Sequence, residues 1–306
     1  ICHRRTCEKV GDRLRMKNIE SRYQAIAWML FASVAFGSMN ALVKWTSSTA
    51  DVWSMVMVRS VVITLGIYLI ATHRGVSLRV NDRKNMFLRC ATGLIAMILY
   101  FTALGLIPIG QAVTLQYTNP LFVALLSGLF LSESVGIRTW GLALASFFGI
   151  ALIVSPDLRT VDINALYALG SGFFAAVAYL YVRMLRSSEH ALSIVFWFAL
   201  FSVIFTTPPA ILNLKGPLSE PKIALALICI GIGAGAGQVG LTYAFHKANA
   251  AWVSAFSYVT VIVAAGYGYF FFGESLDNGD IIGCLLIIVS GILLTLSRSK
   301  RNNAES

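Results

Sequence analysis

Charged residues are scarce in this sequence. Only 12% of the 306 residues are Asp, Glu, Lys or Arg, which is about half of the roughly 25% typical of soluble domains. So few charges exclude an ordinary soluble globular protein. Disorder is excluded as well, because disordered chains combine low hydrophobicity with high charge, whereas 57% of these residues are hydrophobic and the mean hydropathy is +0.75.

Cysteine clusters and the motifs of common enzymes are also missing. The five cysteines are scattered without a CxxC pair, so neither a disulfide framework nor a zinc site is predicted. No HExxH is present, Gly170-Ser171-Gly172 lacks the GxSG spacing, and Asp277-Asn278-Gly279-Asp280 lacks the first glycine of GxGD. The chain is therefore predicted to be no enzyme and to need no cofactor.

Long hydrophobic runs fill most of the chain instead. A membrane-spanning helix needs ~20 predominantly apolar residues. The pattern predicts an all-α membrane protein with ten transmembrane helices, at about 24–46, 52–72, 87–107, 110–131, 138–155, 163–184, 191–212, 222–246, 250–272 and 280–297.

The basic residues are distributed unevenly over the two sides that these spans define. Nineteen of the 24 Lys and Arg residues fall on the side of the termini and only three on the other. By the positive-inside rule both termini are expected in the cytoplasm. The net charge of +10 then reflects topology, and no nucleic-acid partner is expected. The compact loops favour a bacterial inner membrane.

The two ends of the chain are predicted to be cytoplasmic tails. Residues 1–23 form a basic amino-terminal tail and residues 298–306 a short carboxy-terminal one. Because residues 1–15 are polar and Met16 resembles a natural start, we expect residues 1–15 to be an extension without a fixed fold.

The two halves of the chain resemble each other. Residues 100–134 match 241–275 at a constant offset of 141, which pairs Tyr117 with Tyr258 and Glu133 with Glu274. We therefore expect a duplication, with five-helix repeats at 24–155 and 163–297. Because five is odd, the second repeat enters the membrane in the opposite direction, as in secondary transporters whose halves rock about a central site.

The stretch FGSMNALVKW, Arg59, and the paired segments FLSES and FFGES resemble the EamA family of the drug/metabolite transporter superfamily over residues 24–297. The resemblance implies a central cavity lined mainly by spans 1, 3, 4, 6, 8 and 9. It also implies a small organic substrate, since members include amino-acid and metabolite exporters, vitamin carriers and S-adenosylmethionine uptake carriers.

Span 4 holds the densest polar set, Gln116, Tyr117, Thr118 and Asn119, followed by Pro120. Polar groups inside a membrane are costly and tend to face the protein interior. Proline also leaves the carbonyl four residues earlier without its helical donor. Gln116 and Asn119 lie on one helix face and are predicted to bind solute. The alternative is a kinked helix whose polar groups satisfy one another.

Other candidates lie on the remaining spans. Symmetry would place Tyr258 opposite Tyr117. Arg59 could bind a substrate carboxylate, pair with Asp51, or reach the membrane surface. The further candidates for the substrate site are Asn40, Tyr179, Gln238, Tyr243 and Trp252.

No Asp or Glu falls in the middle of any span, so proton antiport through a buried carboxylate is disfavoured. Glu133 and Glu274 are predicted to lock helix ends, and Lys44 and Arg183 to lie at the membrane interface.

Together these features predict a secondary transporter that moves a small amino-acid-like or S-adenosylmethionine-like metabolite by alternating access. The expected partners are this solute and the lipid bilayer, with the chain acting as a monomer or homodimer. The alternatives are an exporter of drugs or other metabolites, an intramembrane enzyme, or a channel.

Overall fold

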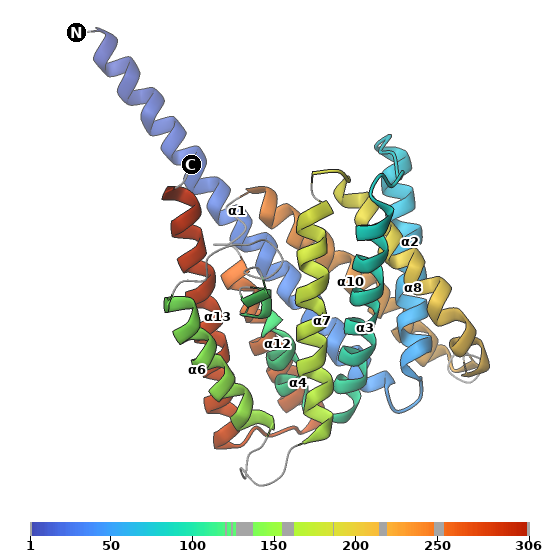
Figure 1. Cartoon of the computed structure of the whole chain (residues 1–306). Coiled ribbons are helices and arrows are strands. Elements are labelled where there is room, and N and C mark those ends of the chain that lie inside the picture. Colours follow the sequence, from blue (N-terminus) through green and yellow to red (C-terminus); the bar gives the residue numbers. More distant parts are fainter. Residues whose placement is uncertain are drawn as a thin grey trace.

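The computed structural model describes residues 2–119, 121–123, 125–126, 137–154, 162–185, 187–213, 219–247 and 254–304, and every regular element in these ranges is a helix (Figure 1). The elements are α1 (Cys2–Thr46), α2 (Val52–His73), α3 (Arg83–Leu106), α4 (Ile109–Gln116), α6 (Ile137–Val154), α7 (Ile163–Leu185), α8 (Ala191–Asn213), α10 (Pro221–Lys247), the 3-10 helix η1 (Ser254–Tyr258), α12 (Val259–Phe272) and α13 (Asn278–Ala304).

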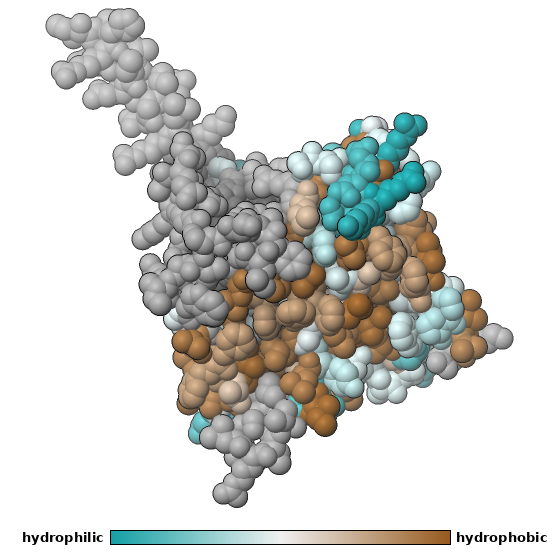
Figure 2. Space-filling model, viewed as in Figure 1, coloured by the Kyte–Doolittle hydropathy of each residue, from teal (hydrophilic) through white to brown (hydrophobic). Residues whose placement is uncertain are grey.

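Six of these helices are long and apolar enough to cross a membrane: Tyr23–Thr46, Val52–His73, Arg83–Leu106, Ile163–Val182, Ala191–Leu212 and Pro221–Leu241. Shorter apolar helices cover Leu144–Ile153, Phe256–Phe272 and Asn278–Leu293. Hydrophobic side chains also dominate the middle of the visible surface (Figure 2). The chain is therefore a multi-pass membrane protein.

The amino-terminal segment corrects one expectation. Residues 2–15 were expected to lack a fixed fold, but they are the first turns of α1, which projects well beyond the other helices (Figure 1). The physical reason lies in the composition, because Cys2–Thr46 contains no proline and residues 2–15 are rich in the helix formers Arg, Lys, Glu and Leu.

Local sequence signals set several helix ends. Asp51 caps α2 by accepting from the amides of Trp53 and Ser54, and Asp82 caps α3 by accepting from the amide of Asn85 at 3.1 Å. Such caps satisfy amides that have no partner inside the helix. The break after α2 contains Gly75 in the left-handed region at φ 64°, a conformation that glycine adopts without steric cost.

The main helix pairs join the first half of the chain to the second. α1 packs against α10, α3 against α7, α2 against α8, and α6 against α13. α12 contacts both α1 and α4, and α4 also contacts α7. The two halves are thus interleaved around α4 and α12, and they do not form two separate bundles (Figure 1).

Glycine allows the closest of these approaches. A Cβ atom on Gly149 of α6 would lie 2.8 Å from the carbonyl oxygen of Gly283 of α13, and the reverse distance would be 2.7 Å. On α10, Gly237 faces the ring of Phe36, and Gly240 faces the carbonyl of Trp28. Small residues at such positions let membrane helices pack backbone to backbone.

Candidate functional site

A break in α4 meets the 3-10 turn that begins α12 inside the bundle. α4 ends at Gln116, and a turn follows at Tyr117 and Thr118. In the other half, η1 ends at Tyr258 and α12 begins at the next residue. α4 is eight residues long, so its end lies about 12 Å from its start along the helix axis, less than half the thickness of a hydrocarbon core of about 30 Å. Interrupted helices at this depth leave backbone polar groups available to a solute.

The structure brings Tyr117 and Tyr258 together at this point. Their ring centroids lie 5.6 Å apart, and the Tyr258 hydroxyl donates a hydrogen bond to the Tyr117 carbonyl oxygen at 3.2 Å. Tyr258 is only 3% exposed. Its hydroxyl sits where a Cβ atom on Gly291 of α13 would be, so this glycine makes room for the ring.

Side chains from α1, α3 and α12 complete a polar cluster around the pair. Asn40 of α1 lies beside Tyr100 of α3, which in turn neighbours Tyr117. Thr260 of α12 also adjoins Tyr117. We call Asn40, Tyr100, Tyr117, Tyr258 and Thr260 the central polar cluster.

This cluster contains a polar atom that the described side chains leave unsatisfied. The Asn40 side-chain oxygen is buried and has no hydrogen-bond partner in the described part of the protein, while the Thr260 hydroxyl is buried next to Tyr117. Buried polar atoms without partners are rare and costly. A free acceptor among aromatic rings is the chemistry expected of a binding site for an uncharged or zwitterionic solute.

Tyr100 was not predicted from the sequence. At the offset of 141 that relates the two halves, its counterpart is Leu241, so the duplication gave no signal there. Its neighbours in the sequence are apolar, and only its position three residues after Met97 on α3 places it on the inward face.

The polar run in span 4 differs from its prediction in one respect. The carbonyl of Gln116 was expected to be free, but the Asn119 side-chain amide donates to it at 3.0 Å. The Thr118 hydroxyl likewise donates to the carbonyl of Leu115 at 2.6 Å. A Cβ atom on Gly172 of α7 would lie 3.0–3.2 Å from these two carbonyl oxygens, so α7 covers them. The donors of Asn119 and Thr118 therefore stabilise the break itself.

Arg59 lies inside the protein and does not pair with Asp51, which was one of the alternatives for it. Its side chain is 8% exposed, and its Nη1 atom lies 2.8 Å from the thioether sulfur of Met97, a weak acceptor. Asp51 caps α2 instead of pairing with Arg59. No carboxylate of the described residues forms an ion pair with Arg59, and its Nε atom has no partner among them.

The remaining candidates are not members of the central polar cluster or lie outside the described residues. Tyr243 is stacked on Trp28, with ring centroids 5.0 Å apart, and accepts a hydrogen bond from Arg74. Tyr179 is half exposed and neighbours both Arg89 and Tyr117 of the central polar cluster, and Gln238 is half-buried on α10. Trp252, Glu133 and the side chain of Arg183 lie outside the described residues.

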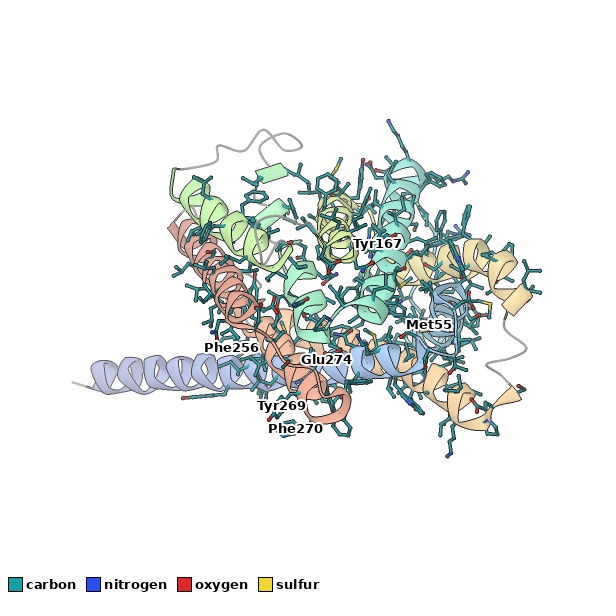
Figure 3. All side chains as sticks on the ribbon, turned by 90° about the horizontal axis from the view of Figure 1, so that it is seen from below. Met55, Tyr167, Phe256, Tyr269, Phe270 and Glu274 are labelled. Atoms are coloured by element: carbon teal, nitrogen blue, oxygen red, sulfur yellow. The ribbon has the colours of Figure 1, made fainter. Side chains whose placement is uncertain are left out.

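A second polar arrangement closes one end of the bundle. Lys44 of α1 pairs with Glu274 at 3.0 Å and donates to the Ile107 carbonyl at 2.7 Å. The other Glu274 oxygen accepts from the Ile109 amide, the first of α4, at 2.8 Å. Figure 3 shows Glu274 where α1, α4 and α12 converge. We call this arrangement the end lock; it confirms that Glu274 locks a helix end and shows that Lys44 is paired.

Metal binding finds no support in the described residues, since none of their His, Cys, Asp and Glu side chains form a group of three or more that could hold an ion.

Comparison with known proteins agrees with these features. Residues 24–155 and 163–296 each match the EamA-like transporter family. The chain is 34% identical to the pseudopaline exporter CntI of Pseudomonas aeruginosa over 273 residues, which cover 89% of this chain and 95% of that one.

More distant relatives are also named as transporters. The chain is 26% identical to a riboflavin transporter of Vibrio cholerae, over 92% of this chain and 96% of that protein. It is 20% identical to an S-adenosylmethionine uptake transporter of Rickettsia bellii, over 90% and 94% respectively. A solved crystal structure with 17% identity shares the fold at a TM-score of 0.64, over 91% of this chain and 99% of the other.

Proposed function

Because the chain belongs to the EamA-like transporter family, we propose that it is a secondary carrier that moves a small organic metabolite across a membrane by alternating access. The observation that carries this proposal is the contact of Tyr117, at the break of α4, with Tyr258, at the 3-10 turn that begins α12 in the other half. A solute held there contacts one helix from each half, so movement of the halves changes the side to which it is open.

The proposed architecture is ten spans in two inverted five-helix repeats, 24–155 and 163–297, flanked by the tails 1–23 and 298–306. The packing supports it. In the two repeats the counterparts are α1 and α7, α2 and α8, α3 and α10, α4 and α12, and α6 and α13. When each helix is exchanged with its counterpart, the contact α1·α10 becomes α7·α3 and the contact α1·α12 becomes α7·α4, and both of these contacts exist. The same exchange leaves α2·α8, α6·α13 and α4·α12 unchanged. Such exchange is what a two-fold relation between the repeats requires.

We propose that the protein lies in a bacterial inner membrane with both termini in the cytoplasm. The support is the excess of basic residues on one side of the spans under the positive-inside rule. In this orientation the end lock lies at the outer face. Transport then requires the Lys44–Glu274 pair to open once in each cycle.

The substrate class follows from the central polar cluster. Its rings offer apolar faces with hydroxyl groups at their edges, and Asn40 adds an unsatisfied amide oxygen. These groups suit an amino-acid-like or S-adenosylmethionine-like solute. Within the family, the similarity to an exporter of pseudopaline makes export of a metabolite the second candidate.

In this proposal, the positive charge of Arg59 binds a negatively charged group of the substrate. A buried guanidinium without a carboxylate is costly, and a carboxylate on the substrate would provide the missing partner. We therefore assign Arg59 to the anionic end of the solute. Asn119 holds the interrupted helix in shape through its bond to the Gln116 carbonyl, and Gln116 presents its side-chain amide to the solute.

The test is transport by the purified chain in proteoliposomes. Radiolabelled S-adenosylmethionine, riboflavin, pseudopaline and a mixture of amino acids are supplied in turn. A carrier gives flux that saturates and is accelerated by the same solute on the opposite side. Flux that neither saturates nor shows this acceleration would identify a channel, and the absence of flux with every solute of the panel would refute the proposed substrate class.

The matched variants are Tyr117→Ala and Tyr269→Ala. Tyr117 is in the central polar cluster, whereas Tyr269 is 66% exposed and points away from the bundle (Figure 3). Transport should fall at least ten-fold in the first variant and stay near the wild-type rate in the second. Equal rates in both would remove the central polar cluster from the substrate site.

A further inference from the structure

An apolar groove runs between α3 and α8 at the end of the protein where α2 and α3 are joined. It has a volume of about 390 Å³. Seven of its eight lining residues are apolar and one is basic: Val80, Arg83, Met86, Phe87, Cys90, Trp197, Phe201 and Ile204.

The groove extends along the direction of the spans. α3 begins at Arg83, and its lining residues lie in its first two turns; α8 begins at Ala191, and its lining residues follow from Trp197 to Ile204. Ile204 is thirteen residues into α8, which corresponds to about 20 Å of helix. Because the hydrocarbon core is about 30 Å thick, the groove reaches from the membrane surface to roughly the depth of one leaflet.

Its walls are aromatic and open outward, while its floor is closed. Phe87 and Phe201 meet edge to face at 5.6 Å, and Phe87 and Ile204 are both more than half exposed. Met86 and Cys90 are buried beneath them. An apolar groove offers water few hydrogen-bond partners, so a hydrocarbon chain is the occupant that fits it.

The mouth of the groove is fixed in place and amphipathic. The Trp197 ring nitrogen donates to the Leu78 carbonyl at 2.8 Å, which attaches α8 to the connection between α2 and α3. Tryptophan is typical of the level of the lipid headgroups. Arg83 therefore lies where the headgroup of a lipid in the groove would be.

The charge at the mouth is positive, because three exposed basic residues outnumber the two acids nearby, Asp82 and Glu189. Arg79, Arg83 and Lys84 are exposed there. Glu189 is occupied by the amides of Asn81 and Asp82, at 2.7 and 2.8 Å.

Asp82 in turn caps α3. Basic residues next to spans attract anionic lipid headgroups. We propose that this groove is a binding site for one phospholipid with an anionic headgroup, with an acyl chain between Phe87 and Ile204 and the phosphate at Arg83.

This site is separate from the central polar cluster. Tyr100 lies ten residues beyond Cys90 on α3, about 15 Å along the helix. The groove also joins a helix of the first half to one of the second. A lipid held there bridges two elements that the proposed carrier would move, so its presence couples transport to membrane composition.

The experiment is native mass spectrometry of the delipidated full chain with equal amounts of phosphatidylglycerol and phosphatidylcholine of the same acyl composition. The first bound lipid should be phosphatidylglycerol, by about five-fold. This preference corresponds to about 1 kcal/mol, the contribution of one basic residue near a membrane surface. In Arg83→Gln the preference should fall toward one, whereas Lys222→Gln, at an exposed basic residue of α10, should keep it.

A second pair of variants tests the groove itself. Ile204→Trp fills it and should lower binding of both lipids at least several-fold, while Leu212→Trp adds the same bulk at an 82% exposed position of the same helix and should not. Equal binding of the two lipids by the wild type, or equal behaviour of Arg83→Gln and Lys222→Gln, would refute the anionic site. Equal behaviour of the two tryptophan variants would refute the groove as its location. None of these outcomes depends on transport activity.

Discussion

The polar groups of the end lock all have partners, whereas the central polar cluster contains a buried polar atom that has none in the described part of the protein. At the end lock, both Glu274 oxygens and the Lys44 ammonium have partners within 3.0 Å. In the central polar cluster, the buried Asn40 side-chain oxygen has none in the described part of the protein. The same contrast separates the two cations, since Lys44 is paired and Arg59 is not.

The difference indicates which region holds the fold and which receives a ligand. Satisfied polar groups rigidify the elements that they join, whereas an unsatisfied one is high in free energy until something binds it. A carrier needs both, because one end must be closed while the middle remains able to accept solute. The substitutions below test this difference between the two regions, in order of decreasing expected effect.

The largest effect is expected for Glu274→Ala. It leaves Lys44 charged and without its partner, and it removes the acceptor of the Ile109 amide. Loss of one partner of a fully buried pair costs 3–5 kcal/mol, so about 2–3 kcal/mol is expected for this partly exposed pair. The midpoint of thermal unfolding in detergent should fall by about 5–10 °C, while Glu220→Ala, at an exposed residue before α10, should leave it unchanged. A midpoint equal to that control would contradict the structural role of the end lock.

The next effect has the opposite sign. Arg59→Met removes a buried cation that has no carboxylate partner, and methionine can pack against Met97. Because an unpaired buried charge costs free energy, the unfolding midpoint should rise, by about 2–4 °C for each kcal/mol gained. Transport should nevertheless fall at least ten-fold if Arg59 binds the substrate carboxylate. Arg59→Lys is the control that keeps the charge, and a stable variant with unaltered transport would show that Arg59 has no substrate role.

A smaller effect is expected for Tyr258→Phe. The ring stays, but the hydroxyl that fills the space beside Gly291 is lost together with its hydrogen bond to the Tyr117 carbonyl. Such a bond contributes about 1 kcal/mol to stability, so the unfolding midpoint should fall by about 2–4 °C, and a several-fold loss of substrate affinity should accompany it because the contact at the break is loosened. Binding measured by scintillation proximity on the detergent-solubilised variant checks this, with Tyr269→Phe as the lipid-facing control. Full affinity in Tyr258→Phe would place the hydroxyl outside the site.

The smallest effect is expected for Asn119→Ala. Its side chain donates to the Gln116 carbonyl, so the loss is a local bond worth about 0.5–1.5 kcal/mol and a few-fold reduction in transport through the shape of the break. Gln116→Ala should reduce transport more. Its side chain makes no hydrogen bond within the described residues that stabilises the break, so in the proposal it is available to the solute. Transport unchanged in both variants would remove span 4 from the proposed site.

Several features of the fold were accessible from the sequence because they are local or compositional. The apolar runs predicted the all-helical membrane protein, and the segments FLSES and FFGES indicated the family that the comparisons then showed. Asp51, which the sequence left open as a partner of Arg59, caps α2 instead. Tyr117 and Tyr258 could be predicted as a pair because the duplication placed them at equivalent positions.

Other features of the site could not be read from the sequence. Tyr100 belongs to the central polar cluster only because α3 turns that face toward α1. The Gln116 carbonyl was predicted to be free on the basis of Pro120, but the donor that occupies it is the nearby Asn119 side chain, whose rotamer no sequence pattern specifies. Tyr243 had been grouped with the site, yet stacking on Trp28 and the bond to Arg74 hold it elsewhere.

The amino-acid sequence was enough to predict that the protein lies in a lipid bilayer, because hydropathy is a property of individual residues. It was also enough to indicate the family, because the family's motifs are short local segments. Tertiary structure alone decided which polar groups are satisfied and which remain free. That outcome depends on helices far apart in the chain, α1 with α10 and α3 with α7, meeting at distances of a few ångströms, and hydrogen bonds and ion pairs form only at such distances.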